Sequence, residues 1–187
     1  MLCNTVIFSS NITIDRDAPA DVNINNTGGV ITPTGPGAIL TDESLTTALS
    51  VGNVTINTNG AGDIDFNPGA VDGVDYTASA ERTFTLIADG DILDMHNNTG
   101  ASSPVNYIIQ TTGNVTIAEY RIKTFGGDVS INTGGMLTIG YLGTGDINTD
   151  GGNVDFVVSE DFLLKSDLTT NSGDVSINTG GMLTIGY

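Results

Sequence analysis

The segment GDVSINTGGMLTIGY decides the fold, because it occurs at residues 127–141 and again, letter for letter, at 173–187. The two copies begin 46 residues apart, and a degenerate unit lies between them. In that unit Phe156 takes the place of Ile131, 25 residues later, so the spacing divides into units of 25 and 21 residues. Self-similarity at a period of this size is the sequence signature of a repeat fold.

Each unit contains three short apolar runs, which in the first unit are residues 129–131, 137–139 and 146–148. Most of these runs alternate between core-type and polar residues with a period of two, which is the pattern of a β-strand. Gly, Asn and Asp separate the runs and suit tight corners. Three strands and three corners in about 21–25 residues predict one coil of a triangular, single-stranded, right-handed parallel β-helix (a β-solenoid).

A Gly-[Asn/Asp]-[Val/Ile] signature extends this pattern upstream. We interpret its glycine as permitting a corner of positive φ, its Asx side chain as bonding the turn, and its β-branched residue as pointing into the core. The signature occurs at 52–54, 62–64, 90–92, 113–115, 127–129, 145–147, 152–154 and 173–175.

The whole chain, 1–187, is therefore predicted to be a single β-solenoid domain. At about 23 residues per coil it would contain about seven or eight coils, which include the runs at 12–14 and 22–24. The repeats are more regular over 105–187. Insertions are expected near 32–50, which has two prolines and a possible short helix or loop, and near 67–82 and 94–104.

Composition limits the partners. The chain carries 22 acidic residues and five Lys or Arg, a net charge of −17, which disfavours nucleic acid and anionic membranes. Cys3 is the only cysteine, so no disulfide forms within the chain. No segment reaches transmembrane length, and the first 15 residues lack the basic and apolar regions of a signal peptide. Any export signal is therefore expected outside this chain.

Few residues suit catalysis. Among the five cations, only Arg121 and Lys123 are close in sequence; they would share one strand face, and we interpret them as an outward salt-bridging pair. His96, beside Asp94, is the only histidine and is interpreted as a solvated loop residue. No catalytic or cofactor-binding residue is predicted, and the chain is not expected to be an enzyme.

Asp146, Asn148 and Asp150, followed by Gly151, match the first half of an EF-hand loop. The twelfth position, which should be Glu, is Val157. Because Asx residues are expected at repeat corners anyway, a plain corner is favoured and no metal site is predicted, although weak calcium binding stays open.

The G-[DN]-V-x-I-N-T-G-G-x-L-T-I cadence resembles the repeats of filamentous hemagglutinin-type, two-partner-secretion adhesins. The resemblance covers 105–187 well and 1–104 loosely. It implies a right-handed β-helical stalk of a secreted or cell-surface protein, with a structural and adhesive role and an unidentified surface receptor or glycan as partner. Two alternatives remain: an ice-binding solenoid with a regular Thr array, and a carbohydrate-active β-helix enzyme with carboxylates beside Arg121.

The repeat continues up to Tyr187, so the chain is expected to be a fragment of a longer repeat protein. A coil with no successor exposes open strand edges. End-to-end self-association is therefore expected.

Overall fold

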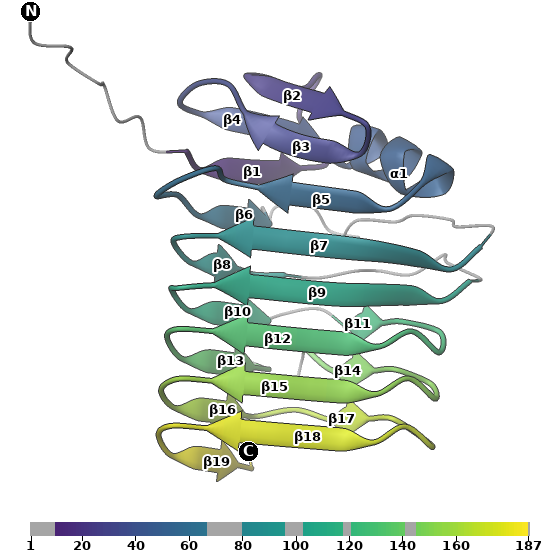
Figure 1. The fold of residues 1–187 in the computed structure, drawn as a ribbon, viewed down its shortest axis with the longest axis vertical. Helices are drawn as coiled ribbons and strands as arrows, with labels where there is room; N and C mark the ends of the chain where they lie inside the picture. The colour runs from purple at the N-terminus through teal and green to yellow at the C-terminus, as the bar shows by residue number, and fades with distance from the viewer. Residues whose placement is uncertain (1–9, 67–79, 96–102, 118–120, 141–144, 187) are drawn as a thin grey trace, which may run out of the picture.

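The structure is a computed structural model that describes residues 10–66, 80–95, 103–117, 121–140 and 145–186. It is a nearly all-β solenoid with one short helix (Figure 1). In Figure 1 the front strands from β5 to β18 point left, the rear strands from β6 to β19 point right, and the chain descends. The winding is therefore right-handed, as the sequence predicted.

The regular coils each contribute one strand to each of two eight-stranded sheets, and further strands from the N-terminal end complete both sheets. From the N-terminal end, the front sheet consists of β2 (Ile24–Thr27), β3 (Val30–Pro33), β5 (Val54–Asn57), β7 (Arg82–Ala88), β9 (Val105–Thr111), β12 (Val129–Thr133), β15 (Val154–Val158) and β18 (Val175–Thr179). The rear sheet consists of β4 (Ala38–Thr41), β1 (Ile12–Asp15), β6 (Ile64–Phe66), β8 (Ile92–Leu93), β10 (Val115–Ile117), β13 (Leu137–Ile139), β16 (Phe162–Leu164) and β19 (Leu183–Ile185).

A third side closes the triangle in the more regular half of the chain. It is a short sheet of β11 (Ile122–Lys123), β14 (Ile147–Asn148) and β17 (Leu168–Thr169). The predicted insertions at 67–82 and 94–104 fall largely outside the described residues.

The stacking register confirms the alignment of the repeats. Ile131 of β12 pairs with Phe156 of β15, and Phe156 pairs with Ile177 of β18, all in parallel. These steps are the predicted shifts of 25 and 21 residues. Ile131 and Phe156 are fully buried, and Ile177 packs against the same core from the last coil. Side chains at this level therefore form one apolar column along the rod.

The N-terminal end departs from the regular winding. β1 lies between β4 and β6 in the rear sheet, so a strand early in the sequence is inserted between two later ones. The run at 22–24 was predicted to be a coil strand, and this prediction is wrong. β2 begins at Ile24 and runs antiparallel to β3 as a hairpin. The solenoid consequently has about six turns, fewer than the predicted seven or eight, because these residues cover the end of the core instead of winding around it.

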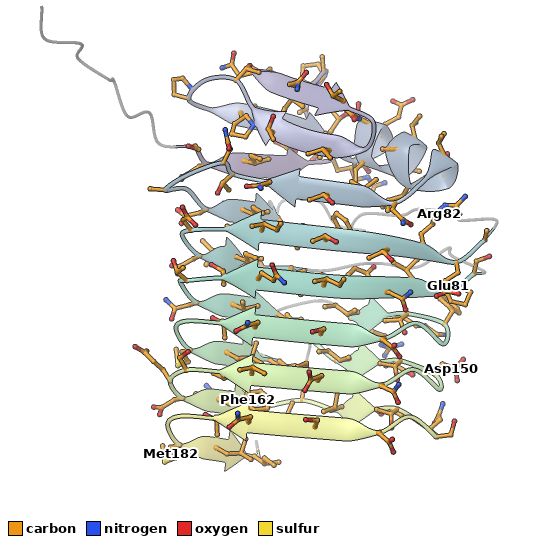
Figure 2. The ribbon with its side chains drawn as sticks, viewed as in Figure 1. Glu81, Arg82, Asp150, Phe162 and Met182 are labelled. Carbon is orange, nitrogen blue, oxygen red and sulfur yellow. The ribbon has the colours of Figure 1, made fainter. Side chains whose placement is uncertain are left out.

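The predicted insertion at 32–50 includes all but the last residue of the helix α1 (Asp42–Val51). Thr41 caps its N-terminus, since its hydroxyl accepts a hydrogen bond from the Ser44 N–H at 3.2 Å. Leu45 and Leu49 are buried on its inner face. At the other end, the Arg82 guanidinium of β7 donates to the carbonyl oxygen of Leu49 at 3.2 Å, and Figure 2 shows Arg82 beside the helix. The helix is thus fastened to the second coil below it.

Candidate functional site

The Asx residues of the corner signature form hydrogen-bonded ladders along the rod. On one corner, the Asp63 carboxylate accepts a hydrogen bond from the Asp91 N–H at 2.8 Å. The Asp91 carboxylate accepts from the Asn114 N–H at 2.6 Å, and the Asn114 side-chain oxygen accepts from the Met136 N–H at 2.9 Å. Each Asx side chain therefore satisfies a backbone donor of the following coil.

A second ladder runs along another corner. The Asn106 side-chain oxygen accepts from the Asp128 N–H at 2.8 Å. The Asp128 carboxylate accepts from the Asn153 N–H at 2.7 Å, and the Asn153 oxygen accepts from the Asp174 N–H at 2.9 Å. These acidic and amide side chains are engaged in stacking the coils, which explains their recurrence without a ligand.

Of the eight glycines of the signature, only Gly145 has the positive φ predicted for the corner. Gly127, Gly152 and Gly173 lack the positive φ expected of them, which falls instead on residues such as Asp150 and Asn171. A Cβ atom at any of the three glycines would lie 2.0–2.2 Å from a carbonyl oxygen of the preceding coil. Glycine is required there because successive backbones touch at this level.

The residues of the possible calcium site lie at such a corner, where Figure 2 shows Asp150 at the edge of the rod. The Asp146 carboxylate is 3.3 Å from the Arg121 guanidinium. The Asn148 side-chain oxygen accepts from the Asp150 N–H at 3.0 Å, and the Asp150 carboxylate accepts from the Asn171 amide at 2.8 Å. These contacts support the corner interpretation. Within the described residues, no three His, Cys, Asp or Glu side chains are grouped to hold a metal ion.

The interpretation of Arg121 and Lys123 as a salt-bridging pair is correct only for Arg121, which is 60% exposed and pairs with Asp146. Lys123 instead places its ammonium 4.3 Å from the centre of the Phe125 ring, a cation–π contact. The Arg121–Asp146 contact was detectable in the sequence, because the two residues are separated by the same 25-residue shift that aligns the repeats. His96 lies outside the described residues.

Two described carboxylates, Asp65 and Asp42, have raised pKa values. Burial raises the pKa of Asp65 in β6, and the negative charges of Asp94 and Asp63 raise it further. Burial also raises the pKa of Asp42 at the start of α1. Asp65 belongs to the rear sheet and Arg121 directly precedes β11 of the third side. The carboxylate that pairs with Arg121 is Asp146, whereas Asp65 lies in a different sheet.

Threonines do not form a regular array on the described faces. In the rear sheet, the outward column contains Thr13, Thr116, Thr138 and Thr184, but Asp65, Leu93 and Leu163 interrupt it. In the front sheet, Thr55 and Thr85 are followed by Ile108, Ser130, Asp155 and Ser176. An ice-binding surface needs a flat, repeating Thr lattice, and these columns do not provide one.

The structure also contains a groove that the sequence did not predict. It has a volume of 690 Å³ and lies between the β2–β3 hairpin and α1, lined by the side chains of Asp21, Asn26, Glu43 and Val51 among others. Its polar groups come from segments that only tertiary packing brings together, so no sequence motif predicts the groove. Carboxylate and amide groups beside a small apolar patch are suited to a hydroxyl-rich ligand.

Among the described residues, no helix has the length and apolar character needed to cross a membrane. Compared with protein-family models, with curated proteins and with solved structures, the chain gives no match.

Proposed function

We propose that the chain is a non-catalytic, structural and adhesive stalk segment of a secreted or cell-surface protein. The observation that carries the proposal is that the recurring residues of the repeat make the contacts that stack one coil on the next. The apolar residues form the core column, the Asx residues form ladders, and the glycines allow backbone contact. Repeat residues used in this way build a rod of continuous core, which is the mechanical requirement of a stalk.

Two further features support the proposal. The cadence of the repeat resembles that of the hemagglutinin-type adhesins, whose rods display adhesive surfaces. The net charge of −17 keeps an elongated particle soluble and discourages its lateral association. A receptor or glycan would contact exposed residues outside the core, and the groove beside α1 is the first place to test.

The proposal is tested by adhesion of beads coated with the chain to cell monolayers, together with a glycan array. We expect saturable binding that falls when Asn26→Ala is combined with Glu43→Gln in the groove. The matched control combines Asn132→Ala with Glu160→Gln, two exposed positions on the other half of the rod, and should bind like the unmodified chain.

Three results would overturn the proposal. The first is an absence of binding to all surfaces and glycans. The second is release of reducing ends from acidic polysaccharides, which would indicate the enzyme. The third is thermal hysteresis of freezing, which would indicate ice binding.

A further inference from the structure

The groove between α1 and the β2–β3 hairpin contains acidic groups that the stacking of coils does not use. Along the rod, the carboxylates of Asp63 and Asp128 each accept a backbone N–H of the following coil. Glu43 also lines the groove, from the first turn of α1, and its side chain is exposed. It has no hydrogen bond or ion pair with the described residues. Glu43 is therefore a carboxylate for which the fold itself shows no structural role.

The second carboxylate of the groove is held in a fixed position. One oxygen of Asp21 accepts hydrogen bonds from the N–H and the hydroxyl of Thr41, at 2.7 Å and 2.9 Å. Thr41 is also the N-cap of α1, so this carboxylate is fastened to the helix. The other Asp21 oxygen accepts no hydrogen bond from the described residues. An acceptor that is already oriented loses little freedom when a ligand binds to it.

Two amides add hydrogen-bond donors to the same groove. The side-chain oxygen of Asn53 accepts the Thr83 N–H at 2.9 Å, which orients the amide and leaves its NH₂ group as a donor. The side chain of Asn26, from β2, makes no hydrogen bond within the described part of the chain. The groove therefore offers both donors and acceptors, as recognition of a polyhydroxylated ligand requires.

The groove also has an apolar wall and open backbone. Val51 is 80% exposed, and Ala48 lies three residues before it on the same face of α1. At Gly28 and Gly52 no atom lies within 4 Å of the place a Cβ would occupy, so a ligand can approach the main chain there. The groove volume of 690 Å³ is within the roughly 300–1,000 Å³ of small-molecule sites. A sugar ring could place its C–H face against this wall.

The charge of the groove selects the kind of sugar. Among the described residues, no Lys or Arg lines it. Arg82 reaches the same helix, but its guanidinium donates to the backbone carbonyl oxygens of Leu49 and Ser50, at 3.2 Å and 3.4 Å. Two carboxylates without a neighbouring cation favour a positively charged ligand and repel sugar acids. The positive group that sugars commonly carry is a free amine.

We propose that the groove binds an oligosaccharide of amino sugars whose amines are free and protonated. The ammonium group pairs with the carboxylates of Asp21 and Glu43, the hydroxyls bond the amides of Asn26 and Asn53, and one ring covers Val51. The inference rests on the proposed adhesive function, because it names the class of glycan that the stalk would recognise. An N-acetylated sugar is rejected, since it leaves both carboxylates without a cation.

Isothermal titration calorimetry with the β-1,4-linked glucosamine trimer tests the proposal. We expect saturable binding of one trimer per chain, and binding of the N-acetylated trimer weaker by about tenfold or more, because a hydrogen bond to a charged group is lost. Trilysine, which has the same net charge and no hydroxyls, should also bind at least about tenfold more weakly, because it cannot bond the amides. An undetectable affinity for the glucosamine trimer, or equal affinities for the trimer and either competitor, would overturn the proposal.

A pair of matched variants locates the binding. Glu43→Gln should weaken trimer binding about tenfold, because it removes one charge-assisted hydrogen bond. Glu160→Gln removes the same charge from an exposed position on the other half of the rod and should leave the affinity unchanged. Both side chains are exposed, so circular dichroism should show that both variants fold. Equal losses in the two variants would mean that the trimer is attracted by the general charge of the rod, which would overturn the proposal.

Adhesion of coated beads separates this inference from the proposed function. Adhesion to cells by a chain that does not bind the trimer would overturn the amino-sugar inference and leave the adhesive function standing. Trimer binding that is lost in Glu43→Gln, by a chain that adheres to no cell surface, would support the inference and count against the adhesive function.

Discussion

Residues 127–140 and 173–186 have the same sequence and form the same two strands, yet only the first copy is core. Alternate residues of β12 are buried, whereas none of β18 is fully buried. The coil above is present in both cases, and only the coil below differs (Figure 1). In this fold a coil thus receives a large part of its burial from its successor, as expected where each repeat contacts only its neighbours.

The two copies form a controlled experiment, because intrinsic propensity is the same in both. Any difference between matched substitutions or matched amides reports what the following coil contributes. Four measurements test how far that contribution extends, and they are ordered from the largest expected difference to the smallest.

Amide hydrogen exchange should show the largest difference. The N–H groups of Val129 and Leu137, bonded to the next coil, should exchange at least about 1,000-fold more slowly than those of Val175 and Leu183, because they open only with the middle of the rod. The measurement is exchange followed by mass spectrometry or NMR at low protein concentration. Equal protection of the two copies would contradict the comparison.

Truncation of matched core residues should differ by less. Ile139→Ala, at a fully buried position, should lower the free energy of unfolding by about 2–4 kcal/mol. Ile185→Ala removes the same atoms from a side chain that is 67% exposed and should cost under about 1 kcal/mol. Chemical denaturation of both variants measures the difference. If the two costs agree, the exposed edge is buried in solution by something other than the following coil.

The Asx ladder supplies a polar version of the test. Asp128→Ala removes the acceptor of the Asn153 N–H and should cost about 1–2 kcal/mol. Asp174→Ala, at the same place in the second copy, has no following coil to satisfy and should cost under about 0.5 kcal/mol. Both variants remove one negative charge, so the relief of general repulsion cancels in the comparison. The denaturation midpoints give the result, and a larger cost at Asp174 would show that the ladder bonds are not what Asp128 contributes.

Outward threonines should show the smallest difference. Thr138 pairs with Thr116 and Leu163 on the outer face of the rear sheet, and Thr184 takes the same position in the last coil. Thr138→Ala and Thr184→Ala should each change the free energy of unfolding by under about 0.5 kcal/mol, because neither side chain points into the core. Thermal denaturation is sufficient. A cost at Thr138 comparable to that at Ile139 would mean that the inward and outward faces are assigned wrongly.

Part of the architecture could be predicted because it depends on short, repeated patterns in the sequence. The alternation in 129–131 fixes which side chains point inward, and the shift of 25 residues from Ile131 to Phe156 fixes the register. The same shift relates Arg121 to Asp146. These relations depend only on a periodic pattern, so reading the sequence was enough to obtain them.

Other parts could not be predicted, for physical reasons. The glycines were assigned to positive φ, but Gly152 is needed because a Cβ would lie 2.0 Å from the Gly127 carbonyl oxygen of the neighbouring coil. The run at 22–24 is apolar like a coil strand, but it crosses the end of the stack. Both outcomes depend on what lies beside the segment in space, which alternation within the segment does not encode.

The sequence by itself determined the solenoid, the register of its coils, the inward and outward faces, and a net charge of −17. Only the tertiary structure decided how the rod ends. It inserted β1 between β4 and β6, covered the N-terminal core with a hairpin and α1, and formed the groove there. It also set the burial of each copy of the repeat, since Leu137 and Ile139 are fully buried whereas Leu183 and Ile185 are 41% and 67% exposed. The reason is that the burial of each coil depends on the coils beside it, which the alternation within one coil does not encode.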